Sequence, residues 1–197
     1  DLLPSPADRG EIEGIDPNTQ QAVSRRPAAD AYLSAFVFKT IADPYVGQLS
    51  VFKVLSGTVK ADDKLINSTT GSEERMHAMF VVRGKEQTAV TEVVAGDIAA
   101  VAKLTNTHTG DSLTPKGLPV KAQPIPRPSP QYAVAIVPHT QADDDKLGNA
   151  LARLQTEDPS LVVDRVEETN QTILRGVGDA HVAVAIERLA RKFGVNV

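Results

Sequence analysis

Between residues 31 and 122, short apolar runs alternate with tight turns. The runs are rich in the β-branched and aromatic residues that favour strands, and the clearest are 35–40, 49–55, 64–68, 76–83 and 98–104. The turns contain Gly or Asp and are Ala61-Asp62-Asp63, Thr70-Gly71-Ser72, Ala95-Gly96-Asp97 and Thr109-Gly110-Asp111. Several short strands at this spacing, without an amphipathic helix between them, predict a closed or nearly closed antiparallel β-barrel.

Residues 123–130 contain prolines at alternate positions, which enforce an extended, polyproline-like conformation. Such a segment serves either as a ligand for a proline-binding domain or as a semi-rigid strap between two domains. The hydrophobic pattern changes immediately after Pro130, and this favours the strap. We therefore place a linker at 123–130, between a barrel domain at 31–122 and a second domain at 131–197.

The second domain begins with a strand over 132–136 that is apolar on both faces, followed by a helix with apolar residues at helical spacing. Glu157-Asp158-Pro159 ends that helix, and two strands at 161–167 and 171–175 follow. The second helix is expected to be capped by Asp179, to bury a stripe of Val182, Ile186, Leu189 and Phe193, and to stop at Gly194 before a last strand from Val195. The order β-α-β-β-α-β predicts a ferredoxin-like sandwich.

The first thirty residues are polar, poorly periodic and rich in Pro and Gly. They are predicted to form a mostly extended linker over 1–30. Arg25-Arg26 is either a small basic patch or a solvated pair of linker charges, and the second interpretation is favoured. Because the chain begins with Asp1 rather than Met, we expect an excised piece or a processed product.

The chain is globular in composition, with 41% hydrophobic residues, 23% charged residues and a formal net charge of −4. This charge gives no overall attraction for nucleic acid, so an RNA contact would have to be a local patch. The absence of cysteine excludes disulfides and thiol chemistry and is compatible with the cytosol. No apolar run approaches twenty residues and no signal peptide is recognisable, so no membrane is expected.

A search for chemistry yields no catalytic, cofactor-binding or metal-binding residue. Gly84-Lys85 lacks the glycines of a phosphate-binding loop and indicates a hairpin tip. The four histidines lack the spacing of a metal site, and Asp143-Asp144-Asp145 is more typical of a helix start than of a Mg²⁺ or Ca²⁺ site. A hydrolase built from His181, Asp179 and a distant Ser stays a disfavoured enzyme alternative, because no nucleophile elbow exists.

One helix face stands out. His181, Ala185, Arg188 and Lys192 follow helical spacing opposite the apolar stripe, with Arg191 beside them. The face is either a solvated surface whose cations complement the helix dipole, which is the favoured interpretation, or a binding surface.

Several short motifs follow one another along the chain. The first is Leu2-Leu3-Pro4-Ser5-Pro6. A second group lies in the predicted barrel: Ala42-Asp43-Pro44-Tyr45-Val46-Gly47, Ser56-Gly57-Thr58, Ala95-Gly96-Asp97 and Thr109-Gly110-Asp111. A third group lies in the second domain: Ala150-Leu151-Ala152-Arg153-Leu154, Glu157-Asp158-Pro159, Gln171-Thr172-Ile173 and Gly176-Val177-Gly178-Asp179-Ala180-His181-Val182. In their order and spacing these motifs resemble elongation factor G, a translational GTPase. The first resembles the segment that leaves its GTP-binding domain, the second group its second domain and the third group its third domain.

This resemblance implies a translation-factor-type β-barrel followed by a ferredoxin-like domain, acting in the ribosome-bound steps of elongation, most simply translocation. The implied partners are the ribosome, through small-subunit rRNA and protein, and the GTPase domain of the same parent chain. GTP and Mg²⁺ would belong to that domain, with none held here, and the protein would be a cytoplasmic monomer. The implied ribosome contacts are Gln48, Lys53, Lys60, His181, Arg188 and Lys192; the implied interdomain or drug-pocket residues are Thr140, Asp179 and His181.

Four positions depart from the family pattern. Gln48 and Gln141 stand where basic residues are frequent, and Asp179-Ala180 stands where Glu and Leu are common. Together these changes remove positive charge from the implied contacts and alter the implied pocket lining. They suggest a divergent paralogue, so ribosome recycling, ribosome protection and a stress-related role remain alternatives. A protein-interaction scaffold without an RNA partner is the alternative from another class, which the acidic balance favours.

Overall fold

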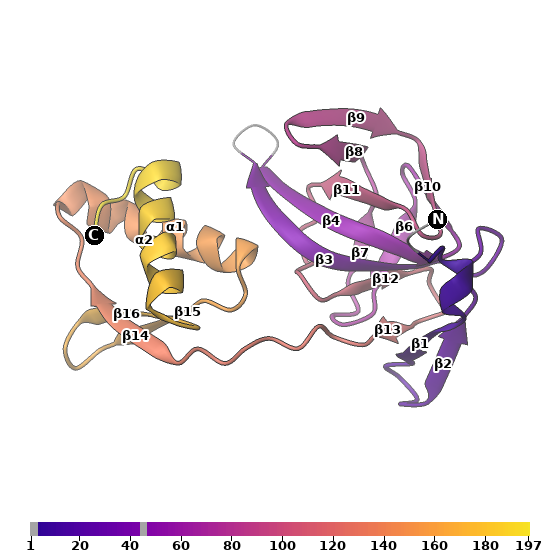
Figure 1. Ribbon diagram of the computed structural model, residues 1–197, viewed down its shortest axis with the longest axis horizontal. Coiled ribbons are helices and arrows are strands. Elements are labelled where there is room, and N and C mark those ends of the chain that lie inside the picture. Colours follow the sequence, from indigo (N-terminus) through magenta and orange to yellow (C-terminus); the bar gives the residue numbers. More distant parts are fainter. Residues whose placement is uncertain (1–3, 44–46) are drawn as a thin grey trace. The chain divides into compact units, whose positions relative to one another are not determined.

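The computed structural model describes residues 4–43 and 47–197 and divides them into two compact units, with the division between Ile125 and Pro126 (Figure 1). The division falls inside the segment predicted to be a linker, 123–130. Leu2, Leu3 and Pro44 to Val46, which contribute to two of the sequence motifs, lie outside the described residues.

The first unit is dominated by an antiparallel sheet of eight strands, in the order β7-β6-β12-β3-β4-β11-β8-β9, with a separate pair β10-β5. Its strands are β3 (Ser34–Asp43), β4 (Gly47–Ser56), β5 (Thr58–Lys60), β6 (Lys64–Asn67), β7 (Glu73–Arg75), β8 (Met79–Arg83), β9 (Glu86–Val90), β10 (Glu92–Val94), β11 (Ile98–Ala102) and β12 (Ser112–Thr114). The curved sheet seen in Figure 1 is the predicted barrel-type fold.

The core of this unit follows from side-chain alternation along the strands. In β4, Phe52 and Val54 are fully buried, whereas Lys53 between them and Val51 before them are only half-buried. The inward positions of neighbouring strands, among them Val37, Met79 and Val101, join the same core cluster. Burying a side chain of this size contributes about 1.5–3 kcal/mol, so the alternation of apolar residues determines which face of each strand points inward.

The predicted strand runs are confirmed, with shifted ends. The run at 76–83 is shorter in the structure, because β8 begins only at Met79. Gly84-Lys85 forms the predicted tip, here between β8 and β9. Each predicted turn contains a residue at positive φ, namely Asp62, Gly71, Gly96 or Gly110.

Residues 4–30 differ from the predicted linker. After the short 3-10 helix η1 (Ala7–Arg9), they form a hairpin of β1 (Ile12–Ile15) and β2 (Ala22–Arg25), and β1 also pairs with β13 (Lys121–Ala122). The hairpin turn is closed by Asp16, whose Oδ1 accepts the backbone N–H of Asn18 at 2.8 Å. Only Gly14 of the two hairpin strands is buried, so no alternation of apolar residues indicated a sheet, and the third strand comes from more than a hundred residues away.

The second unit contains β14 (Tyr132–Ile136), α1 (Gln141–Glu157), β15 (Val162–Val166), β16 (Gln171–Gly176) and α2 (Asp179–Phe193). The strands form an antiparallel sheet in the order β14-β16-β15. Val134, Leu174 and Val163 are aligned across it, and they join one core cluster with the apolar residues of both helices. The helices therefore cover one face of the sheet, as a ferredoxin-like arrangement requires.

Three details of this unit differ from the sequence predictions. The N-cap of α2 is Gly178 rather than Asp179, which is the first helical residue. No strand forms over 195–197 within the described chain: Gly194 takes a left-handed conformation, and Val195 turns back to donate to the carbonyl of Leu189 and is fully buried. In β14 only Ile136 is buried, because the helices cover one face of the strand.

None of the helices in the described part of the chain is long and apolar enough to cross a membrane.

Candidate functional site

The implied ribosome contacts on the barrel unit do not share one surface. Lys53 lies on the outer face of β4, whereas Gln48 is an odd number of residues away and therefore faces the other side. The Gln48 side chain instead donates to the carbonyl of Thr107 at 3.3 Å. Lys60 ends β5 in the separate strand pair, opposite Glu92. The structure thus separates these three residues.

A lysine that the sequence did not single out joins Lys53 on the outer face. Lys39 of β3 and Val51 of β4 are cross-strand partners, so Lys39 is a diagonal neighbour of Lys53 on the same side. A register shift between Val37 and Lys39 brings it there, and only the paired structure reveals such a shift. Lys39 is exposed and Lys53 half-buried, and neither makes an ion pair with any described residue.

The surface beside these lysines is apolar. Ala100 is fully buried on this outer side, where it forms a small apolar cluster with Leu49 and Ala102. Four partly buried side chains pack against this cluster: Ile41, Val51, Phe80 and Val82. We call Lys39, Lys53, Val51, Phe80 and the half-exposed Ile98 the outer lysine face. Unpaired ammonium groups beside apolar surface suit the phosphates and riboses of a nucleic acid backbone.

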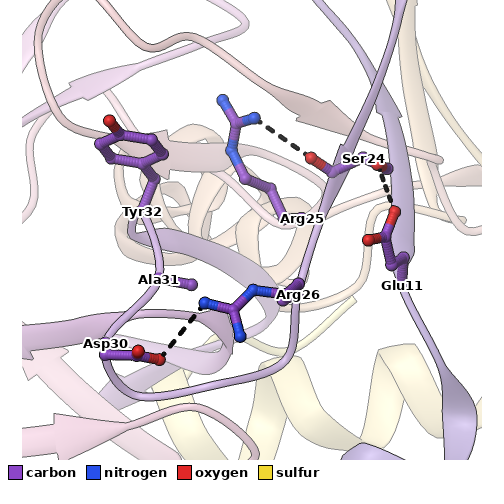
Figure 2. Close-up of a pocket in the computed structure, with 7 residues that line it drawn as sticks. All are labelled: Glu11, Ser24, Arg25, Arg26, Asp30, Ala31 and Tyr32. Carbon is purple, nitrogen blue, oxygen red and sulfur yellow. Dashed lines mark hydrogen bonds and ion pairs between the residues drawn. The ribbon is translucent and has the colours of Figure 1, made fainter.

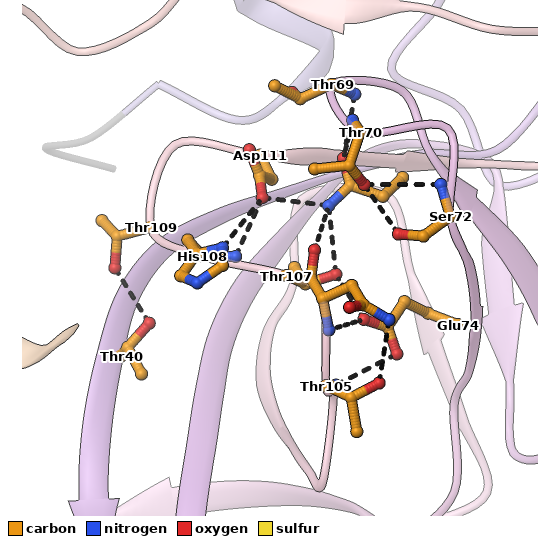
Figure 3. Close-up of polar contacts among 12 residues, drawn as sticks. Thr40, Thr69, Thr70, Ser72, Glu74, Thr105, Thr107, His108, Thr109 and Asp111 are labelled. Atoms are coloured by element: carbon orange, nitrogen blue, oxygen red, sulfur yellow. Dashed lines mark hydrogen bonds and ion pairs between the residues drawn. The ribbon is translucent and has the colours of Figure 1, made fainter. Parts of the chain in front are cut away.

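A buried polar network, drawn in Figure 3, fixes the loop over residues 105–111. The Thr107 carbonyl that accepts the Gln48 side chain belongs to this loop. The Asn67 side chain donates to the Asp111 carboxylate at 2.9 Å and to the Thr107 hydroxyl at 3.2 Å. The Glu74 carboxylate accepts the Asn106 N–H at 2.6 Å and the Thr107 hydroxyl at 3.0 Å. Because these groups are buried and mutually satisfied, they hold the loop in one conformation. Asp111 of the Thr109-Gly110-Asp111 motif therefore has a structural role.

The cations of α2 contact the end of α1. Arg188 lies 3.3 Å from Glu157, and Lys192 also binds the Glu157 carboxylate, whose side chain is only 4% exposed. Ala185, expected on the solvated face, is buried instead, since the face turns toward α1. Glu157 thus pairs with both cations of this helix face and offsets one of their two positive charges, and Arg191 pairs with Glu187 on the exposed side.

His181 uses both ring nitrogens within this unit. Its Nδ1 accepts the backbone N–H of Val177 at 3.1 Å, and its Nε2 lies 2.9 Å from an Asp158 oxygen. An accepting Nδ1 places the proton of the neutral ring on Nε2, which donates to Asp158. Burial opposes ionisation of Asp158, but hydrogen bonds from Ser160 and His181 outweigh it and hold the pKa of Asp158 below its usual range.

This arrangement does not form the hydrolase that pairs His181 with Asp179. The Asp179 carboxylate accepts the N–H of Ala180 at 2.7 Å, and Ser160 donates to Asp158 rather than to His181. No Ser is therefore activated by the imidazole within the described residues. The described part of the chain also contains no group of three His, Asp or Glu residues that could hold a metal ion.

Thr140 lies far from Asp179 and His181 along the sheet. It caps α1, which follows the end of β14, whereas α2 follows the end of the antiparallel β16. The Thr140 hydroxyl donates to Asp143 at 2.6 Å, and Asp143 also accepts the N–H of Asn196 at 3.0 Å. These bonds lower the pKa of Asp143. The implied interdomain residues thus occupy opposite ends of this unit.

Comparison with known proteins matches both units. Residues 32–116 match the family model described as elongation factor G domain 2, and residues 127–197 match elongation factor G, domain III. A crystal structure of a protein from Thermus thermophilus is 32% identical, with a TM-score of 0.79, over 98% of this chain. The chain spans 26% of the length of that protein. The chain therefore belongs to the elongation factor G family, and it carries that family's second and third domains.

Proposed function

We propose that this chain binds the ribosome and contributes to the translocation step of elongation within a cytoplasmic translational GTPase. GTP and Mg²⁺ would be held by the GTPase domain of the parent protein, and the two units described here would respond to that domain without catalysing a reaction. Family membership supports a translation elongation factor-like protein. The outer lysine face is the observation in this structure that supports the ribosome contact.

Electrostatics argues for a local rather than a general RNA contact. The net charge of −4 repels phosphates at long range, so attraction must come from cations that no carboxylate neutralises. Arg188 and Lys192 are paired with Glu157, whereas Lys39 and Lys53 have no ion-pair partner among the described residues. We therefore favour the outer lysine face over the α2 face as the ribosome contact, although His181, Arg188 and Lys192 remain predicted contacts.

Salt-dependent pelleting with ribosomes tests this proposal. Removing one phosphate contact should lower the slope of log K against log salt by about 0.7–0.9. For the Lys39→Gln, Lys53→Gln double variant, we expect the slope to fall by about 1.5. The Lys85→Gln, Lys116→Gln double variant, which removes the same charge from other exposed positions, should behave as the parent chain. Pelleting that is insensitive to salt, or an equal fall in both double variants, would contradict the proposal.

Translocation itself requires the parent protein. The same lysine substitutions can be placed in the full-length protein. At a subsaturating concentration of that protein, they should slow single-round movement of tRNA and mRNA as many fold as they weaken ribosome binding. Weakened ribosome binding, combined with a normal rate of translocation at a saturating concentration of the factor, would fit the proposal. Normal translocation at every concentration would contradict the contact, and ribosome splitting without translocation would assign the factor to recycling.

A further inference from the structure

A cavity of about 570 Å³ lies beside the N-terminal hairpin, in a region that neither family model matches apart from Tyr32. It opens between β2 and the segment that leads into β3 (Figure 2). Its polar lining consists of Glu11, Ser24, Arg25, Arg26, Asp30 and Tyr32. The volume lies within the usual range of small-molecule sites.

The rim of the cavity is fixed by the barrel. The Ser56 hydroxyl donates to the carbonyl of Arg26 at 2.7 Å, and the Thr58 hydroxyl donates to the carbonyl of Ala29 at 2.9 Å. Between them, the Gly57 N–H donates to the carbonyl of Ala28 at 2.9 Å. These three bonds hold the rim in place, so a ligand would meet a largely preformed surface and would lose little affinity to ordering it.

Arg25 and Tyr32 form the aromatic side of the cavity. The Arg25 guanidinium lies 5.8 Å from the centroid of the Tyr32 ring, and Tyr32 is 64% exposed. Nη1 of Arg25 donates to the carbonyl of Ser24 at 3.2 Å, whereas its buried Nε has no acceptor among the described residues. A buried donor without an acceptor is costly.

The remaining charges provide both donors and acceptors. Arg26 and Asp30 lie 3.6 Å apart, with side chains 62% and 80% exposed, so this pair is weak and a ligand can replace either partner. One oxygen of Glu11 accepts the Ser24 hydroxyl at 2.5 Å. The cavity therefore combines an exposed aromatic ring, two guanidinium groups and two carboxylates.

We propose that this cavity binds one nucleotide, with the base stacked on Tyr32 and the phosphate paired with Arg25 and Arg26. Arginine matches the geometry of a phosphate, and stacking on an exposed ring accepts any base. The carboxylates of Glu11 and Asp30 accept N–H groups of the base edge, which guanine presents as neighbouring donors. A bare anion would use the arginines alone and would be repelled by these carboxylates, so the balanced charge favours a nucleotide over inorganic phosphate.

The nucleotide can come from single-stranded RNA or from solution. Backbone amide chemical shifts of the ¹⁵N-labelled chain test both sources, with GMP, guanosine, inorganic phosphate and the hexaribonucleotide (AG)₃ as probes. We expect GMP to shift the amides of Ser24, Arg25, Arg26 and Tyr32 with saturation. Tighter binding of (AG)₃ by about tenfold or more would identify RNA as the source, and affinity equal to that of GMP would identify the free nucleotide; either supports the site.

Matched variants assign the contacts. Tyr32→Leu and Arg25→Gln should each weaken GMP binding by about tenfold, as removal of one stack or one charged contact predicts. Tyr132→Leu and Arg83→Gln change the same residue types at exposed positions elsewhere and should leave it unchanged. The dispersion of the same spectra reports whether each variant is folded. A further variant, Tyr32→Phe, keeps the aromatic ring and should retain GMP binding.

Three results would overturn the proposal: no shifts at about 10 mM GMP, shifts of equal size with inorganic phosphate, or binding of guanosine as tight as that of GMP. The measurement uses no ribosomes, so its failure leaves the ribosome-binding proposal intact, and ribosome pelleting can fail without affecting the nucleotide site.

Discussion

Replacement of His181 by Ala should destabilise the second unit even though His181 is partly exposed at the surface. The substitution leaves the Val177 N–H and one Asp158 oxygen without their protein partners. A neutral hydrogen bond contributes about 1 kcal/mol and a bond to a charged group about 1.5–3 kcal/mol. Because the His181 and Asp158 side chains are 24% and 27% exposed, water replaces part of both interactions. We therefore expect the free energy of unfolding to fall by about 2 kcal/mol.

Differential scanning calorimetry of the 197-residue chain measures this decrease. In a unit of this size, a decrease of about 2 kcal/mol corresponds to a fall in Tm of roughly 8–15 °C. The fall should appear only in the unfolding transition whose Tm Leu174→Ala also lowers, because Leu174 is in the core of the same unit. His77→Ala is the matched control: His77 also lies near a carboxylate, Asp62 at 3.8 Å, but it is 50% exposed. That exposed pair should contribute less than about 1 kcal/mol.

A double-mutant cycle separates the His181–Asp158 contact from the Val177 contact. Asp158→Asn alone, and together with His181→Ala, should show a coupling energy of about 1 kcal/mol or more. Additive effects would show that the His181–Asp158 hydrogen bond contributes nothing. If His181→Ala is no more destabilising than His77→Ala, then the tautomer and both hydrogen bonds assigned here are wrong, and His181 is free to act as a surface contact.

Three further predictions concern stability. The pKa of Asp158 is lower in the folded chain than in the unfolded chain, so the ionised carboxylate stabilises the fold above about pH 4, and this stabilisation disappears as the pH falls through the pKa of the folded chain. Urea titrations from neutral to acid pH should show this loss of stability, and the loss should be smaller in the Asp158→Asn variant. Gly57→Ala should lower the free energy of unfolding by more than about 2 kcal/mol, because the new Cβ would lie 2.6 Å from Leu33 Cα at a φ of +75°. Gly71→Ala, at a φ of +77° with no atom within 4 Å of the new Cβ, should lower it by only about 1 kcal/mol through backbone strain. Equal decreases in the two variants would refute the steric argument. Leu174→Ala should cost about 2–5 kcal/mol, since Leu174 is fully buried, whereas Val184→Ala, at a residue 53% exposed, should change the unfolding free energy by less than about 0.5 kcal/mol.

The local pattern of the chain was sufficient for the elements themselves. Alternating apolar residues predicted β3 and β4, and helical spacing with Glu157-Asp158-Pro159 predicted α1 and its end. Turns were equally readable, because Gly71 and Gly96 tolerate the positive φ that each turn requires. These features depend on interactions between neighbours in sequence, and those interactions are visible in the residues alone.

Contacts between distant segments could not be read in this way. The hairpin of β1 and β2 is local, but only Gly14 of its two strands is buried, so residues 4–30 lacked the pattern of a strand and resembled a linker. Its third strand, β13, pairs with β1 from the far end of the unit. The predicted last strand at Val195 failed for a related reason: the valine is fully buried among the helices instead. Hydrophobicity signals burial but does not identify the element that provides it.

The candidate sites followed the same division. The family resemblance implied Lys53 and His181 as candidates, but only pairing of β3 with β4 placed Lys39 beside Lys53. Only packing of α2 on α1 gave His181 and Arg188 their carboxylate partners. The Arg25–Tyr32 cavity likewise depends on a rim held by β4 and β5. Charge in the sequence states what a side chain can do, and the neighbours brought by folding determine whether that charge is neutralised or left for a partner.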